Sequence, residues 1–151
     1  NGESVAELIT NLLPELSLYP WMFNEGPSAN WWSNTANQQQ YLKWLEEQLA
    51  IKDDTHWYHV TKKAIKDHGG HFLLTKYCDN SVYNLARLAR PKANLLPWRF
   101  ENDKLPDEWW KNINNRQSAL LDIANELGVK EFSDWYNFKS TSVIKYGGSS
   151  Y

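Results

Sequence analysis

The chain has 151 residues, of which 42% are hydrophobic and 23% are charged, which suits one ordinary domain or two small ones and excludes a disordered tail. The formal net charge of -2 argues against a uniformly basic nucleic-acid-binding protein. The single cysteine, Cys78, excludes an internal disulfide framework and a cysteine zinc cluster, and no apolar run reaches the roughly 18 residues that span a bilayer.

The first predicted helix covers about 4–13 and ends before Pro14, because the residue before a proline disfavours the helical conformation. A loop around Pro20-Trp21 then leads into the longest predicted helix, about 31–50. The apolar stripe of that helix consists of Trp31, Gln38, Leu42, Leu45 and Leu49.

Two shorter helices are predicted next. The first covers 60–68, with Thr61 as its N-cap and Gly69 as a left-handed stop, and the second covers 71–77. The β-branched and aromatic composition of 57–61 also favours a short strand, which remains the alternative for that segment.

The second half of the chain repeats the first. A shift of 77 residues places Pro20-Trp21 on Pro97-Trp98, and a shift of 78 places Trp31-Trp32 on Trp109-Trp110. Further matches are Ser4-Val5 with Ser81-Val82, Leu8 with Leu85, Leu42 with Leu120, Trp57-Tyr58 with Trp135-Tyr136, and Gly69-Gly70 with Gly147-Gly148. We therefore predict an all-α fold with little or no strand, built from two tandem three-to-four-helix copies: copy A at 1–77 and copy B at 78–151.

The helices of copy B carry their own start and stop signals. The segment 81–90 is predicted to be helical, with Asn80 or Ser81 as its cap and Pro91 as its stop. Gly128 suits the end of the long helix. The apolar stripe of that helix consists of Trp109, Ile113, Leu120, Ile123 and Leu127.

Tryptophan is far more frequent than in an ordinary chain, with nine residues, eight of which lie at matched positions while Trp44 has no match. The rings could form a ligand platform or the cores of two small units. We favour the core, because each ring removes about 150–250 Å² from water. The rings expected to be mostly buried are Trp21, Trp32, Trp57, Trp98, Trp110 and Trp135.

The sequence contains no motif of a catalytic, phosphate-binding or metal site. His68 and His71 are three residues apart, but two glycines separate them and copy B has no equivalent. The paired acids Glu46-Glu47 and Asp53-Asp54 are expected on an exposed helix side and in a loop. We therefore predict that the protein is not an enzyme, has no cofactor and no metal, and takes no small-molecule ligand.

Side-chain amides recur at the start of both long helices. Two roles are open for them: contact with a base edge or peptide backbone, or hydrogen bonds to the neighbouring loop, which we favour. The residues are Asn34, Asn37 and Gln39, matched by Asn112, Asn115 and Gln117.

Positive charge is concentrated in residues 59–100, which contain eight basic and two acidic residues. A short helix that presents Asn and Arg outward suits docking in a nucleic-acid groove, whereas cations in a last helical turn also stabilise the helix dipole. The candidate partner-binding residues are Lys62, Lys63, Lys66, Tyr83, Asn84, Arg87, Arg90 and Lys92.

The assembled pattern of WY, GGxxLLxxY and PWxF motifs resembles a Trp-rich tandem helical repeat family of eukaryotes, notably algae and some fungi, which carries no assigned activity. The aromatic pair in that family usually follows an aspartate, as in Asp134-Trp135-Tyr136, whereas copy A has His56 there. The resemblance implies the repeat boundaries and no catalytic residue. A second similarity, to small DNA-binding repeats attached to homing endonucleases, covers only about 69–90.

Together these observations predict a non-catalytic binding or scaffold module, an accessory subunit that docks on a larger protein assembly through exposed aromatics and segregated charge. The alternative is a DNA- or RNA-binding helical repeat that uses the basic segment 59–100. The first residues, NGESVAEL, lack a secretory pattern, so we expect an intracellular protein, in an organelle if a targeting segment has been removed.

Overall fold

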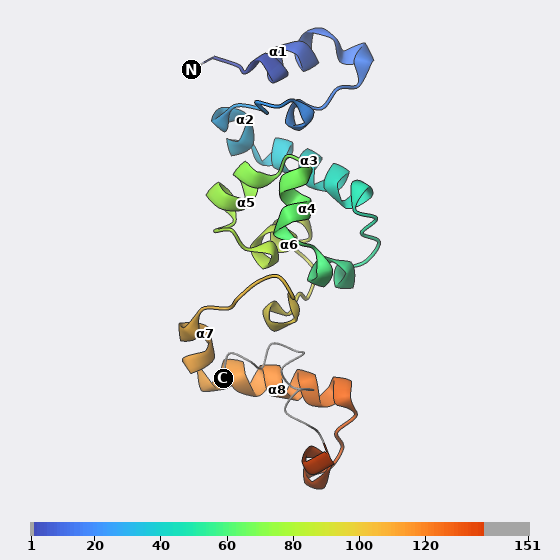
Figure 1. The fold of residues 1–151 in the computed structure, drawn as a ribbon, viewed down its shortest axis with the longest axis vertical. Coiled ribbons are helices and arrows are strands. Elements are labelled where there is room, and N and C mark those ends of the chain that lie inside the picture. Colours follow the sequence, from blue (N-terminus) through green and yellow to red (C-terminus); the bar gives the residue numbers. More distant parts are fainter. Residues whose placement is uncertain (1, 138–151) are drawn as a thin grey trace. The chain divides into compact units, whose positions relative to one another are not determined.

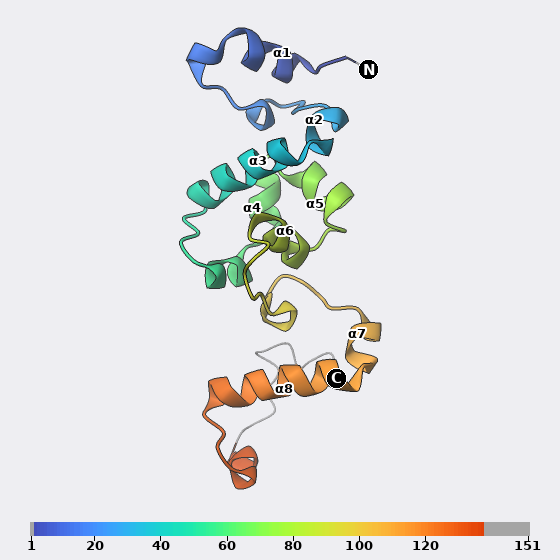
Figure 2. The same cartoon turned by 180° about the vertical axis from the view of Figure 1, so that it is seen from behind.

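The computed structural model describes residues 2–137, and all regular structure among them is helical (Figures 1 and 2). The predicted all-α fold is confirmed. The alternative strand at 57–61 is wrong, because Asp54–His59 forms a 3₁₀ helix, η3. The chain divides into two compact units, Asn1–Leu95 and Leu96–Tyr151, called unit 1 and unit 2.

Unit 1 holds the longer series of helices. In chain order they are α1 (Val5–Leu12), η1 (Pro14–Leu16), η2 (Pro20–Met22), α2 (Ala29–Ser33), α3 (Thr35–Gln48), η3, α4 (Lys62–Asp67), α5 (His71–Tyr77) and α6 (Val82–Ala89). Unit 2 holds η4 (Pro97–Arg99), α7 (Asp107–Lys111), α8 (Ile113–Leu127) and η5 (Phe132–Asn137).

The capping residues and glycines predicted from the sequence lie at helix ends in the structure. The hydroxyl of Thr61 accepts a hydrogen bond from Ala64 N at 3.0 Å, so Thr61 caps α4 as predicted. Ser81 caps α6 in the same way. Gly69 and Gly128 follow α4 and α8 with φ angles of 78° and 73°, the left-handed conformation that ends a helix.

The predicted long helix at 31–50 is confirmed over 35–48, but its first part is wrong, because the chain breaks at Asn34 into α2 and α3. Asn34 has an extended backbone (φ -84°, ψ 119°), and its side chain accepts a hydrogen bond from Ala36 N at 2.9 Å. Asn112 breaks the chain between α7 and α8 with the same bond, to Asn114 N at 2.9 Å. The reason is that an asparagine cap offers the backbone an alternative to continuing the helix.

Aromatic rings build much of the core of unit 1. Trp21 stacks on Tyr19 with 4.9 Å between ring centroids, and Trp32 meets Tyr41 edge-on at 5.2 Å. The predicted burial holds for Trp21, Trp32, Trp57 and Trp110, whereas Trp98 and Trp135 are half-buried. The largest fully buried side chains of the described residues are Trp32, Trp57, Tyr41, Leu42, Leu45, Ile65, Leu73, Leu74, Leu85, Ile123, Val82 and Cys78.

The helix α6 begins the predicted copy B, yet it packs against α3 and η3 inside unit 1. In unit 1, α4, α5 and α6 gather on one side of α3, and α1 lies on the other side (Figures 1 and 2). The compact unit therefore extends one helix beyond residue 77, where the sequence repeat divides. The predicted match at Gly147-Gly148 lies outside the described residues.

Candidate protein-interaction surface

Arg90, a predicted partner-binding residue, is held inside unit 1 by two acids. Its Nε lies 2.8 Å from Glu46 Oε1, and its Nη1 lies 2.8 Å from Asp54 Oδ1. Hydrogen bonds from the guanidinium to Glu46 and Asp54 raise the pKa of Arg90 above its already high ordinary value. Arg90 thus joins α6 to α3 and η3, and its charge is already compensated.

Other predicted residues also make contacts within unit 1. Lys63 pairs with Asp67 at 2.7 Å on the exposed side of α4. Asn84 donates to the carbonyl of Cys78 at 3.2 Å. Arg87 lies over the ring of Tyr83, 5.5 Å from its centroid.

The remaining predicted residues are three lysines on two segments. Lys62 and Lys66 belong to α4. Lys92 follows α6 and lines, with Asp54 and Arg90, a pocket of 520 Å³. An acid therefore lies among the basic residues of this pocket.

Sequence reasoning missed the acids that hold the arginines. Glu46 was expected on an exposed helix side, but its carboxylate also accepts a hydrogen bond from the indole N–H of Trp57 at 2.8 Å, so that expectation is wrong. In unit 2, Asp122 accepts hydrogen bonds from Trp98 Nε1 at 2.8 Å and from Arg99 Nε at 2.6 Å. Burial alone raises the pKa of Asp122, but these bonds outweigh burial and the pKa lies below its ordinary value.

The recurring amides have a structural role, as favoured, but they bond to carbonyls of the helices α2, α7 and α6 and not to the predicted Pro-Trp-x-Phe loop, so that part of the prediction is wrong. Asn37 Nδ2 donates to the carbonyl of Trp31, and Asn115 Nδ2 donates to that of Trp109, each at 3.0 Å. Gln39 Nε2 donates to the carbonyl of Leu88 at 2.8 Å, which ties α3 to α6.

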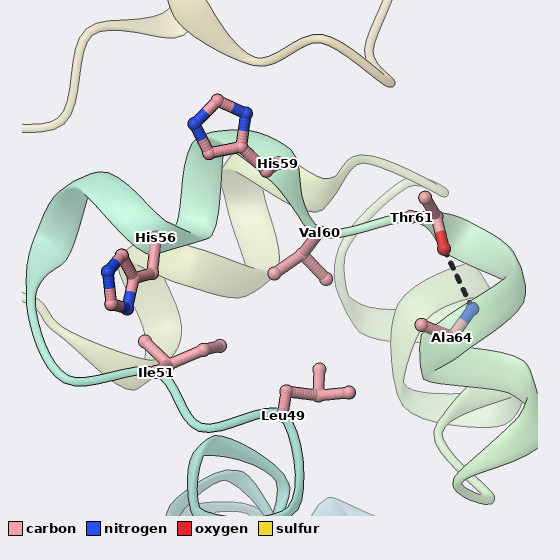
Figure 3. A pocket seen from close by; sticks show the side chains of 7 residues that line it. All are labelled: Leu49, Ile51, His56, His59, Val60, Thr61 and Ala64. Carbon is pink, nitrogen blue, oxygen red and sulfur yellow. Dashed lines mark hydrogen bonds between the residues drawn. The ribbon is translucent and has the colours of Figure 1, made fainter.

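A pocket of 340 Å³ contains two of the four histidines (Figure 3). Its walls are mainly apolar: Leu49, Ile51, His56, His59, Val60, Thr61 and Ala64. The rings of His56 and His59 do not point toward each other (Figure 3). His56 Nδ1 accepts a hydrogen bond from the backbone N–H of Lys52 at 3.1 Å. The imidazole therefore closes the turn between these two residues. Residues 2–137 bring no group of three metal-ligating side chains together.

The most unusual surface of unit 1 lies on its first 22 residues. Helix α1 buries Ala6 and Glu7 and half-buries Ile9, while Val5, Leu8 and Leu12 are exposed. We call the exposed apolar residues of this segment the α1 surface: Val5, Leu8, Leu12, Leu13, Leu16, Leu18, Tyr19 and Met22. Exposed apolar side chains gathered in one segment make it a candidate interaction site. A pocket of 300 Å³ lined by Ser17, Leu18, Tyr19, Met22 and Phe23 continues it.

Glu7 fixes this orientation of α1. Its carboxylate accepts hydrogen bonds from Ser4 N at 2.8 Å, from Ser28 N at 2.9 Å and from Ser28 Oγ at 3.0 Å. One acid thus completes the capping box of α1 and joins this helix to the N-cap of α2. Burial alone raises the pKa of Glu7, but the bonds from Ser4 and Ser28 outweigh burial and lower the pKa from 4.5.

We expect acid to release α1 from α2. Because the folded-state pKa of Glu7 is lowered, its stabilising contribution is present above the ordinary value of 4.5 and is lost as the pH falls through the lowered value. The protection factors of the α1 amides, which correct the observed exchange for its slower intrinsic rate in acid, should therefore fall as the pH is lowered. Glu7→Gln should make exchange fast at neutral pH, and Glu15→Gln, at an exposed carboxylate of η1, is the matched control. Equal exchange rates in the wild type and Glu7→Gln would contradict this role.

Comparison with known proteins adds no assignment: no family model, no curated protein and no solved structure matches the chain. Both family resemblances therefore remain predictions. Within residues 2–137, the helices are too short or too polar to cross a membrane.

Proposed function

We propose that the chain is a tandem of two copies, 1–77 and 78–151, and acts as a non-catalytic protein-binding or scaffold module. The observation that carries the binding function is the orientation of α1, which buries the carboxylate of Glu7 and exposes Leu8 and Leu12. Leaving such side chains in water forgoes about 1.5–3 kcal/mol each. The α1 surface is therefore proposed as the docking site for a partner protein.

The positions of the helices support the tandem arrangement. A shift of 77 places α1 on α6 and η2 on η4, and a shift of 78 places α2 on α7 and η3 on η5, in each case with identical bounds. The backbone N–H of Lys52 donates to His56, and at the matched position the N–H of Lys130 donates to Asp134 at 2.8 Å. A histidine nitrogen and a carboxylate oxygen thus accept the same bond.

Contact of the segment 59–100 with DNA or RNA is the alternative proposal and has less support. Arg90 and Arg99 are paired with carboxylates inside their units, which lowers the charge available for phosphates. Lys63 shares its charge with Asp67. The α1 surface is apolar, so the two proposals predict binding through different residues.

The docking proposal predicts that charge on α1 abolishes capture of a partner. A tagged chain would be incubated with an extract of the native source, crosslinked, and its partners identified by mass spectrometry. Leu8→Glu with Leu12→Glu should remove the partner that the wild type recovers. Tyr77→Glu, which places a negative charge at an exposed ring on α5, should retain it. Recovery of the same proteins by the wild type and both variants would contradict docking through α1.

A further inference from the structure

The helices α1 and α6 occupy matched positions in the proposed copies, but only α6 is covered. In unit 1, α6 packs against α3 and η3, and its Val82 and Leu85 are fully buried. The counterparts on α1, Val5 and Leu8, are 60% and 47% exposed. The same helical face is therefore an internal contact in α6 and an open surface in α1.

The surface that receives α6 has an open counterpart as well. A shift of 78 residues places α3 on α8 and η3 on η5. Leu121 is 67% exposed and Phe132 is 91% exposed. The large apolar residues that α8 and η5 expose, which we call the α8 surface, are Ile113, Leu120, Leu121, Phe132 and Tyr136.

Three positions that form an ionic contact between the α6 segment, α3 and η3 are all apolar at the matched positions of the α1 segment, α8 and η5. In unit 1, Arg90 of the α6 segment pairs with Glu46 of α3 and Asp54 of η3, each at 2.8 Å. The counterparts are Leu13 for Arg90, Ala124 for Glu46 and Phe132 for Asp54. An ionic contact is thus replaced by apolar side chains on both partners, so a contact between the α1 surface and the α8 surface would bury no unpaired charge at these positions.

We propose that the α1 surface of one chain docks on the α8 surface of a second copy, in the arrangement that α6 adopts on α3 and η3. This inference rests on the proposed repeat and binding function and identifies the partner as a second copy. Because the two surfaces differ, the contact is head-to-tail and each dimer keeps one open surface of each kind. Further copies therefore add to the same assembly.

Sedimentation velocity of the purified chain tests the proposal. Between about 1 μM and about 1 mM, the weight-average mass should rise above 17.7 kDa with concentration. Leu8→Glu with Leu12→Glu places two charges in the apolar α1 surface, and Leu121→Glu with Phe132→Glu places two charges in the apolar α8 surface. Each double variant should stay monomeric and keep the unfolding midpoint of the wild type, because the substituted side chains are exposed.

Mixing the two double variants distinguishes the head-to-tail contact from other associations. Each variant retains the surface that the other lacks, so an equal mixture should form 1:1 dimers and nothing larger. If two α1 surfaces met instead, the variant with Leu121→Glu and Phe132→Glu would associate alone, and the proposal would be wrong. A wild-type chain that stays monomeric throughout also overturns it. Capture of another protein by α1 is a separate measurement, so failure here leaves the proposed function standing.

Restoring the ionic pair tests the register of the contact. Leu13→Arg alone and Phe132→Asp alone should each weaken association at least about tenfold, because each leaves one unpaired charge in an apolar contact. A chain that carries both substitutions should regain association, since the arginine of one copy then meets the aspartate of the next. Equal weakening in the single and combined variants would show that the register differs from that of α6.

Discussion

Replacing Trp57 by alanine is expected to destabilise unit 1 by about 3–5 kcal/mol, because the change leaves a large cavity in a packed core. The ring of Trp57 is fully buried, and its N–H donates to Glu46 Oε1 at 2.8 Å. Guanidinium unfolding followed by far-UV circular dichroism measures the loss. A tryptophan that served as an open ligand platform would instead tolerate alanine with little change in stability.

Two further variants separate packing from hydrogen bonding at Trp57. Trp57→Phe keeps the six-membered ring but removes the fused ring and its N–H, while Glu46 still pairs with Arg90, so the expected loss of about 2 kcal/mol is smaller than that of alanine. Met22→Ala removes a side chain of unit 1 that is 63% exposed and should cost at most about 0.5 kcal/mol. If Trp57→Ala cost no more than Met22→Ala, Trp57 would not belong to the core.

The parts of the fold that could be predicted from the sequence depend on contacts between near neighbours. Thr61 caps α4 through Ala64, three residues away, and Gly69 ends the same helix by its own backbone conformation. The break at Asn34 was missed because the apolar stripe continues across it from Trp31 to Leu42. The recurrence of the asparagine at Asn112 was a usable signal, since an Asn repeated at one position of a helical pattern indicates a cap.

The candidate site was harder to predict because it depends on contacts between distant residues. An amphipathic helix ordinarily turns its apolar face inward, so the pattern of α1 predicts buried leucines. The bonds between Glu7 and Ser28, 21 residues apart, hold the opposite face inward. Arg90 and Glu46 are 44 residues apart. The charges near Arg90 in the sequence therefore did not show that a distant carboxylate neutralises this residue of the basic segment.

Gly69→Ala is expected to destabilise unit 1 through two effects. Gly69 has a φ angle of 78°, in the left-handed region that costs a residue with a Cβ about 1–2 kcal/mol. An added Cβ would also lie 2.4 Å from the backbone carbonyl oxygen of Trp21, so the chain must shift at a further cost of about 1–3 kcal/mol. The sum is therefore expected to reach several kcal/mol in denaturant unfolding.

Two other glycines of unit 1 isolate the two effects. Gly26 has a φ angle of 63° with no atom within 4 Å of an added Cβ, so Gly26→Ala should show the conformational cost alone. Gly70 has an ordinary φ of -92°, but its added Cβ would lie 2.2 Å from the Tyr41 hydroxyl and 2.7 Å from Ile65 Cγ2, so Gly70→Ala should show the steric cost alone. Gly69→Ala should exceed Gly26→Ala by at least about 1 kcal/mol. Equal losses would mean that the backbone at Gly69 does not press against Trp21.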